Sequence, residues 1–234
     1  MSEETRAGSA GAGPGTITPD GCAVEMYARM GPDGEQHIVA GAVRAGARTV
    51  LELGAGAGRV THALLELGFE VVAVDESPEM LAEIRGARTV RSTIEGLDLG
   101  ERFDAVLLAS YLVNTAGPAL RADLLRTCRR HVKDDGCVLI QREGEGWHDP
   151  ANVPRELLRG PLRITVAAVE PLGPGRTSVR MEYDFDGRRW SQTHTSHDLD
   201  EAAVEAVLAE AGLRVDAYLT DDRTWLRAVP QCAD

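Results

Sequence analysis

Residues 49–58 read TVLELGAGAG, and this stretch decides the fold. Its first five residues are apolar or β-branched apart from Glu52, which is typical of a short buried strand. Glycines then stand at positions 54, 56 and 58. Because glycine has no side chain, it allows left-handed backbone conformations and lets a ligand approach the backbone closely. The stretch therefore predicts a strand followed by a ligand-binding loop.

Strand-like and helix-like segments alternate on both sides of this loop. The predicted strands cover residues 49–53, 70–75, 88–92, 103–110 and 136–143, and the predicted helices cover 59–69, 77–86 and 118–132. This alternation implies βαβ units with parallel pairing. A helix at 198–213 and strands at 214–220 and 223–229 complete the pattern. We expect an α/β fold with a doubly wound, mostly parallel, seven-stranded Rossmann-like sheet.

The rhythm changes after Trp147. Three strand-like segments, 162–172, 176–187 and 188–197, follow one another with turns rich in Gly, Pro or Asp-Gly and no helix between them. Consecutive strands of this kind pair antiparallel, so we expect an inserted antiparallel sheet after the fifth strand. The sequence predicts four parts: a disordered tail at 1–16, N-terminal helices with the core at 17–147, the inserted sheet at 148–198, and the end of the core at 199–230.

The composition restricts the class of partner. A formal net charge of −12 repels phosphate backbones, and the chain has no block of Lys and Arg interleaved with aromatic residues. The acidic start, MSEETRAGSAGAGPG, differs from a secretory signal, and no apolar run approaches the ~20 residues of a membrane span. The four cysteines form no CxxC pair, which argues against a zinc ribbon. We expect a cytoplasmic globular protein that binds neither nucleic acid nor membranes.

Asp75 narrows the choice of ligand. It ends the second predicted strand about 20 residues after the glycine loop, where a carboxylate can accept hydrogen bonds from ribose hydroxyls. The loop reads GxGxG, whereas a dinucleotide site has GxGxxG, and Glu52 would lie beside the pyrophosphate. These residues favour a ligand that has a ribose but lacks a pyrophosphate. They disfavour the alternative of a nicotinamide oxidoreductase.

The stretch ELGAGAGRVTHALLELGFEVVAVDESPEMLAEIR, residues 52–85, strongly resembles the class I S-adenosylmethionine-dependent methyltransferases. The resemblance covers about residues 46–145, and the last helix with two strands also matches that family's ending. It implies that S-adenosylmethionine is the cofactor, that the glycine loop lines its methionine portion, and that Asp75 holds its ribose. The residues that the resemblance places at the cofactor are Tyr27, Glu52, Gly54, Ala55, Gly56, Asp75, Glu76, Met80, Thr93, Ile94, Glu95, Ala109 and Ser110.

Two of these assignments leave alternatives open. Many relatives carry an aspartate near the adenine where this chain has Thr93, so either the Thr93 hydroxyl or Glu95 must take that role. Tyr27 resembles the N-terminal tyrosine that some small-molecule members fold over the cofactor, but a core tyrosine would fit the same position. Ala109 and Ser110 match the segment whose backbone borders the methyl donor.

Methyl transfer needs alignment more than it needs a nucleophilic residue. A general base is required only when the acceptor is protonated at the working pH. His148 follows the fifth strand in EGEGWHDP and is the histidine that we expect to act as base, with a surface role as the alternative. Tyr111 could form one wall of the acceptor site or belong to the core. Because Ala109-Ser110 stands where metal-dependent catechol methyltransferases need a carboxylate, we expect no metal.

The resulting hypothesis is methyl transfer to O, N or C of a small molecule, in specialised, natural-product metabolism. A protein that uses the cofactor for cyclase or decarboxylase chemistry, or that only binds it, remains an alternative because fold does not fix function. A homodimer formed through the inserted sheet is a further possibility.

Overall fold

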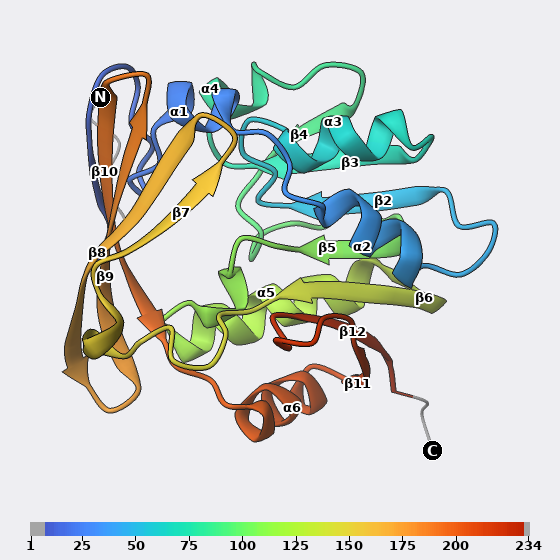
Figure 1. Ribbon diagram of the computed structural model, residues 1–234. Helices are drawn as coiled ribbons and strands as arrows, with labels where there is room; N and C mark the ends of the chain where they lie inside the picture. Colours follow the sequence, from blue (N-terminus) through green and yellow to red (C-terminus); the bar gives the residue numbers. More distant parts are fainter. Residues whose placement is uncertain (1–7, 232–234) are drawn as a thin grey trace. The chain divides into compact units, whose positions relative to one another are not determined.

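The computed structural model describes residues 8–231, which form two compact units (Figure 1). The core unit contains residues 34–144 and the described residues from 199 onward. The sheet unit contains residues 145–198 together with the described residues up to 33. Each unit has its own hydrophobic core.

The core unit is built on a seven-stranded sheet, as the sequence predicts. Its strand order is β11-β12-β6-β5-β2-β3-β4. The five strands from β6 to β4 are parallel, while β12 runs antiparallel to β6 and β11 antiparallel to β12. The strands are β2 (Thr49–Leu53), β3 (Glu70–Asp75), β4 (Arg88–Arg91), β5 (Phe103–Leu108), β6 (Val132–Gln141), β11 (Leu213–Tyr218) and β12 (Trp225–Pro230).

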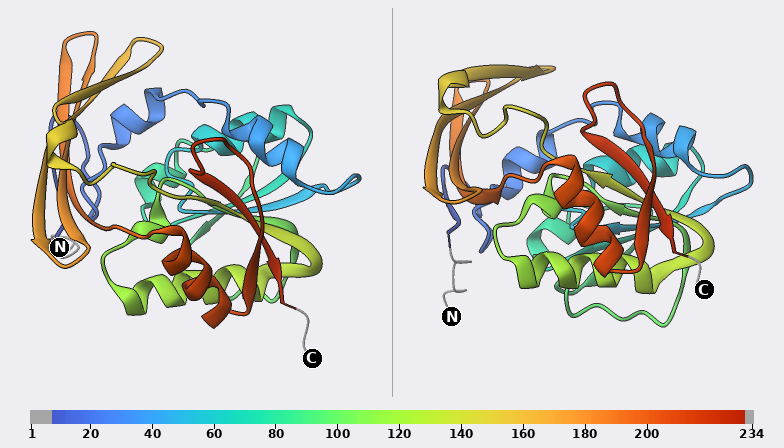
Figure 2. Two further views of the ribbon diagram at one scale, coloured as in Figure 1. Left: turned by 60° about the horizontal axis from the view of Figure 1, so that its bottom comes forward. Right: turned by 90° about the horizontal axis from the view of Figure 1, so that it is seen from below.

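Helices cover both faces of this sheet because successive strand residues point to opposite sides. Val50 of β2 packs with the face covered by α2 (Glu35–Ala42) and α3 (Arg59–Glu66), whereas Leu51 packs with α5 (Pro118–His131) and α6 (Glu201–Glu210). Helices α5 and α6 lie side by side, as both views in Figure 2 show. The short helix α4 (Pro78–Leu81) follows β3, and its N-cap Ser77 accepts a hydrogen bond from the Met80 amide.

The sheet unit holds an antiparallel sheet in the order β1-β10-β9-β8-β7. The predicted Asp-Gly turn between the second and third strand-like segments is confirmed, because Phe185 and Arg188 are paired on either side of Asp186 and Gly187, at the end of the hairpin between β9 and β10. Helix α1 (Val24–Arg29) packs with this sheet through Met26, and Trp190 belongs to the same apolar cluster. The strands are β1 (Ala10–Ala12), β7 (Arg155–Arg159), β8 (Leu162–Gly173), β9 (Arg176–Phe185) and β10 (Arg188–His197); a short 3-10 helix, η2 (Pro150–Asn152), precedes β7.

Two predictions about the N-terminal region are wrong for the described residues. The predicted disordered tail includes Ala10–Ala12, which form β1 and pair with Ser191–Thr193 of β10. The Trp190 indole N–H also donates to the Pro14 carbonyl. Residues 17–33 belong to the sheet unit, although the sequence placed them with the core. The physical reason is that backbone pairing to a sheet edge needs no distinctive side-chain pattern.

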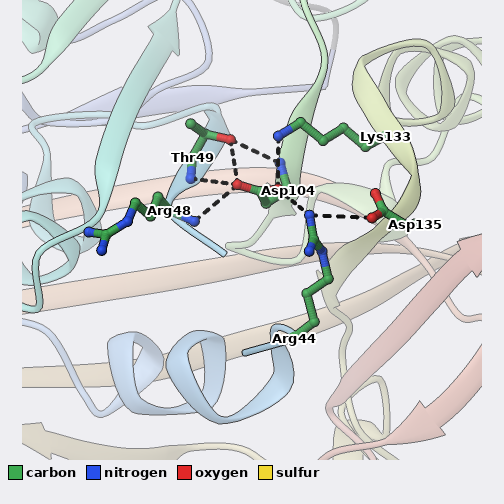
Figure 3. Close-up of polar contacts among 6 residues, drawn as sticks. All are labelled: Arg44, Arg48, Thr49, Asp104, Lys133 and Asp135. Atoms are coloured by element: carbon green, nitrogen blue, oxygen red, sulfur yellow. Dashed lines mark hydrogen bonds and ion pairs between the residues drawn. The ribbon is translucent and has the colours of Figure 1, made fainter. Parts of the chain in front are cut away.

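The amino end of the core sheet, where the parallel strands begin, is tied together by one carboxylate (Figure 3). Asp104 Oδ2 accepts from the backbone amides of Arg48 and Thr49 at 3.0 Å and from the Thr49 hydroxyl at 2.9 Å. Its Oδ1 contacts Arg44 at 3.0 Å and Lys133 at 2.8 Å. Burial alone would raise the pKa of Asp104, but the bonds from Lys133, Arg48 and Thr49 hold that pKa well below its usual range. This cluster joins the starts of β2, β5 and β6.

Candidate functional site

The carboxyl end of the core sheet, where the parallel strands finish, contains the point at which the strand order reverses. β2 and β5 are neighbours in the sheet, with β3 and β4 beyond β2 and with β6 beyond β5. Ligands of open α/β sheets bind outside the carboxyl ends of the strands at such a point. Gly54 directly follows β2, and Ala109 directly follows β5. The predicted ligand loop therefore lies at the position that this kind of fold uses for binding.

The glycine loop requires glycine for its backbone shape. Gly54, Gly56 and Gly58 have φ values of +70°, +56° and +83°, in the left-handed region that side chains disfavour. A Cβ on Gly54 would lie 2.8 Å from Leu112 Cδ1, whereas a Cβ on Gly56 would meet no described atom within 4 Å. Gly54 is thus packed against the protein, and the space beside Gly56 is open. Gly58 is the N-cap of α3, whose first amides point toward this end of the sheet.

Asp75 connects the glycine loop to the start of α4. Its Oδ2 accepts from the Gly56 amide at 2.8 Å, and its Oδ1 accepts from the Ser77 amide at 2.9 Å. These two amides come from different segments, so together they fix the direction in which the carboxylate points. The half-buried carboxylate is held in one orientation beside Gly56. This arrangement fits a ribose whose two hydroxyls donate to one carboxylate.

Glu52 lies beneath the loop rather than on its surface. Only 4% of the residue is exposed, and its Oε2 accepts a short hydrogen bond from the Thr61 hydroxyl of α3. Burial raises the pKa of Glu52 to about 7, although the Thr61 bond and the nearby Arg59 guanidinium act in the opposite direction. Arg59 forms an ion pair with Glu35, which is 2% exposed. Glu52 therefore links β2 to the first turn of α3. Its protonation state determines the charge on the buried side of the glycine loop.

The segments that follow β2, β4 and β5 come together at Gly54. Leu112 and Ile94 supply the atoms nearest to a Cβ on Gly54. The turn after β5 has an unusual backbone, because Ser110 and Tyr111 have φ values of +55° and +61° without being glycine. Such conformations cost about 1–3 kcal/mol each and persist where the surroundings impose them, often at functional sites. The turn leads into a short 3-10 helix, η1 (Leu112–Asn114).

The residues predicted near the adenosine lie on the segments after β3 and β4. Glu76 is half-buried and Met80 is 3% exposed. Thr93 uses its hydroxyl to accept from the Gly96 amide at 3.3 Å, so it shapes its own loop. Glu95 is half-buried in the same loop. The core unit thus contains every predicted cofactor residue except Tyr27.

Tyr27 and His148 lie in the sheet unit. The Tyr27 hydroxyl donates to Gln192 Oε1 of β10 at 3.3 Å, and burial raises the pKa of Tyr27, as does the nearby Cys22. His148 Nε2 lies 3.1 Å from the Ser196 hydroxyl, and its Nδ1 lies 3.4 Å from Asp198 Oδ1. Because a carboxylate can only accept, this geometry favours a proton on Nδ1 and a lone pair on Nε2.

Sequence reasoning missed two residues at this end of the core sheet. Gln141 Oε1 accepts from the Ser110 amide at 2.9 Å, and Gln141 is 7% exposed. Arg121 of α5 is 4% exposed and its Nε donates to the Val113 carbonyl at 2.8 Å. Burial lowers the pKa of Arg121. In the sequence, Gln141 is a polar residue at the end of an apolar strand and Arg121 is a polar residue within a helix. Neither position reveals the residue's hydrogen-bond partner.

Comparison with known proteins identifies the core. Residues 51–138 match the model of a family described as a methyltransferase domain. An uncharacterized methyltransferase of Mycobacterium tuberculosis is 44% identical over 94 residues, which are 38% of this chain and 39% of that relative. The matched part of this chain therefore spans well under half the length of that curated relative.

Solved structures show the same fold over most of the chain. The CcbJ methyltransferase from Streptomyces caelestis is 21% identical with a TM-score of 0.69, covering 86% of this chain and 91% of its own. CalS10, an amino pentose methyltransferase from Micromonospora echinaspora with its S-adenosylmethionine bound, is 20% identical with a TM-score of 0.66, covering 84% of this chain and 90% of its own. These structures confirm the predicted Rossmann-like fold. Membership of the class I S-adenosylmethionine-dependent methyltransferase family, with S-adenosylmethionine as cofactor, stays a prediction that the match at residues 51–138 supports.

The residues present fit such a cofactor. The open space beside Gly56, the oriented Asp75 carboxylate and the amides of α3 supply room, a hydrogen-bond acceptor and hydrogen-bond donors at one end of the sheet. Within residues 8–231, no group of three or more His, Cys, Asp and Glu side chains is arranged to hold a metal ion. None of the helices in that range is both long and apolar enough to span a membrane.

Proposed function

We propose that this protein transfers the methyl group of S-adenosylmethionine to a small-molecule acceptor. The observation that carries the proposal is the Asp75 carboxylate bonded to the Gly56 amide, beside open space, at the reversal point of a matched methyltransferase domain. The same contact joins the loop that would lie against the methionine portion to the carboxylate that would hold the ribose.

The cofactor contacts divide among four segments in this proposal. The glycine loop, Gly54 to Gly56, would lie along the methionine portion, with Glu52 supporting it from below. Asp75 would accept from the ribose, and Glu76 with Met80 would lie near the adenosine. The residues beside the adenine would be Thr93, Ile94 and Glu95, and those beside the methyl donor would be Ala109 and Ser110. These four segments belong to the core unit, and the contact of Tyr27 with the cofactor stays a prediction from the resemblance.

The chemistry makes few demands on the protein. When bound, the cofactor supplies an electrophilic methyl group on a sulfonium that is its own leaving group. The protein must hold the acceptor atom in line with that methyl group and exclude water, and orientation of this kind can lower a barrier by ~7–11 kcal/mol. No side chain has to form a covalent bond with the substrate.

We propose a nitrogen of an amine-bearing natural product as the first acceptor class to test. CalS10 is named as an amino pentose methyltransferase, and it shares the fold over 84% of this chain. An ammonium must lose a proton before its nitrogen can attack, so a base would accelerate the reaction by ~10²–10⁴. Oxygen and carbon acceptors are the other outcomes of such a screen.

His148 is the proposed base, with Asp198 as its orienting partner. The carboxylate favours the tautomer in which Nε2 carries the lone pair. The Ser196 hydroxyl lies 3.1 Å from that nitrogen and would donate to its lone pair while the base is unprotonated. Tyr111, half-buried on the turn after β5, is proposed to contact the acceptor.

The direct test incubates the protein with S-adenosylmethionine and a panel of amino sugars, phenols and other amines, and measures S-adenosylhomocysteine by mass spectrometry. Acceptor-dependent S-adenosylhomocysteine with a product heavier by one methylene supports the proposal, and its absence with every acceptor contradicts it. For the base, H148Q should lower kcat by ~10² while leaving affinity for S-adenosylhomocysteine unchanged. D198N is the matched variant and should lower kcat less.

We also propose that the sheet unit mediates a homodimer. β7 is an edge strand, and two consecutive residues within it, Leu157 and Leu158, are 45% and 70% exposed. Exposed apolar residues on an edge strand favour pairing with a second strand. Light scattering should give the dimer mass for wild type and the monomer mass for L158K. A monomeric wild type would contradict the proposal.

A further inference from the structure

The backbone turn after β5 is held by buried polar side chains from outside the turn. Ser110 and Tyr111 take successive left-handed conformations. Two bonds inside the segment, Leu112 N–H to the Ala109 carbonyl at 3.3 Å and Asn114 N–H to the Tyr111 carbonyl at 2.8 Å, continue it into η1. Neither of these bonds fixes the Ser110 amide.

Gln141 supplies the contact that fixes this amide. It stands at the last position of β6, the strand next to β5, and its Oε1 accepts from Ser110 N at 2.9 Å. The residue is 7% exposed, so the bond is shielded from water. The bond fixes the peptide plane between Ala109 and Ser110, which is the plane from which the left-handed turn begins.

The conformation of this turn also determines the position of Leu112. Its Cδ1 lies 2.8 Å from the position that a Cβ on Gly54 would take. The turn after β5 therefore packs directly on the first glycine of the loop after β2. A change at Ser110 would therefore displace Leu112 against the glycine loop. Ser110 itself is exposed at this end of the sheet.

We infer that Gln141 is a positioning residue, which holds the Ser110–Tyr111 turn in the backbone conformation that cofactor binding requires. The inference rests on the proposed function, since it assigns a role toward the same cofactor. Gln141 acts through the backbone of Ser110 and through Leu112. Two further buried groups support the same segment: the Asn114 side chain accepts from the Glu143 amide at 2.9 Å, and Arg121 donates to the Val113 carbonyl.

The test is calorimetric titration of S-adenosylhomocysteine into wild type, Q141M, S110G and the double variant Q141M/S110G. Q141M should raise the Kd at least tenfold, because Ser110 no longer gains a bond in its left-handed conformation. Glycine takes that conformation without steric cost, so the loss of Gln141 should matter little once position 110 is glycine, and the double variant should bind within threefold of S110G. A shorter amide, Q141N, should behave like Q141M if the methionine variant does not fold.

His131 provides the matched control. It is fully buried, and its Nε2 accepts from a loop amide, Leu99 N, at 3.1 Å, near the start of β6. H131M should lower the melting temperature without changing the Kd for S-adenosylhomocysteine. A loss of affinity in H131M equal to that in Q141M would mean that general destabilisation is the cause, and it would overturn the inference.

The remaining outcomes separate the two proposals. Binding by wild type that is unchanged in Q141M and Q141N contradicts the inference alone. A double variant that is weaker than S110G by as much as Q141M is weaker than wild type also contradicts it, because the lost affinity would then have nothing to do with backbone conformation. If wild type binds no S-adenosylhomocysteine, the proposed function fails, and the inference fails with it.

Discussion

The two ends of the core sheet use a buried or half-buried aspartate in opposite ways. At the amino end, Asp104 accepts from two backbone amides, a hydroxyl and two cationic side chains, all within the protein. At the carboxyl end, Asp75 accepts one backbone amide on each oxygen beside the open space at Gly56. Asp104 joins the starts of three strands, whereas Asp75 is oriented by two loop amides beside the open space at Gly56.

The same contrast appears in the backbone. Ser110 and Tyr111 are left-handed without being glycine and lie at the carboxyl end, whereas the left-handed positions that precede β2 and β3 at the amino end, Gly46 and Gly68, are glycines. Strain that is retained only where the surroundings impose it indicates a functional end of the fold. The difference teaches that stability and ligand binding can be altered separately in this unit, and each prediction below applies to one end.

The largest effect is expected for G56A. A methyl group there meets no described atom, so its cost to the free protein is only the left-handed strain, about 1 kcal/mol. The methyl group would occupy the space assigned to the cofactor, and binding of S-adenosylhomocysteine should fall below detection by calorimetry.

G46A is the control for this prediction. Gly46 precedes β2 at the amino end, has a φ of +83°, and also has no described atom within 4 Å of a Cβ. G46A introduces the same backbone strain away from the proposed cofactor site. It should therefore lower stability as much as G56A does and leave the affinity for S-adenosylhomocysteine unchanged. Equal affinities for G56A and G46A would break the comparison.

A smaller effect, on stability alone, is expected for D104N. Removing the charge leaves a buried amide among groups that had bonded a carboxylate, which should cost roughly 3 kcal/mol in urea unfolding at pH 7. Because the pKa of Asp104 is held below the usual ~3.9, this contribution is complete at neutral pH and is lost as the pH falls below about 4. The difference between wild type and D104N should therefore shrink in acid. A difference that stays constant down to pH 2 would contradict the assignment.

The smallest effect concerns Glu52 and the pH dependence of stability. A carboxyl whose pKa rises from its usual ~4.3 to about 7 on folding binds more protons in the folded state, so stability should fall as the pH rises between these values. The expected loss between pH 5 and pH 8 is about 2 kcal/mol. E52Q keeps an oxygen for the Thr61 hydroxyl and should remove that part of the slope. If the free energy of unfolding in urea changed with pH equally for wild type and E52Q, Glu52 would not be the source of the pH dependence.

The site was largely readable from the sequence because its residues lie on short loops after apolar strands. TVLEL followed by glycines, and EVVAVD ending in Asp75, place their last residues at one end of a parallel sheet by topology alone. The left-handed conformations of Ser110 and Tyr111 were not readable. They depend on Gln141, about 30 residues later in the chain, and neither residue type signals that conformation.

Two parts of the fold were not predicted for the same reason. Ala10–Ala12 have no alternating pattern, and they become a strand only because β10 offers an edge. β7, with the sequence RELLR, pairs only with β8 and leaves its leucines exposed, so its composition resembles that of a surface loop. The Asp104 cluster could not be predicted from the sequence either, because the partners of Asp104 are far from it along the chain, at positions 44, 48, 49 and 133.

The central claim is that the carboxyl end binds the cofactor and the amino end holds the sheet together. The most direct measurement titrates S-adenosylhomocysteine into wild type, D75A and D104N and records the urea unfolding of all three. The account predicts that D75A weakens binding at least 100-fold, and that D104N binds within threefold of wild type although it unfolds at lower urea. Unchanged affinity in D75A, or an equal loss of affinity in D104N, would contradict it.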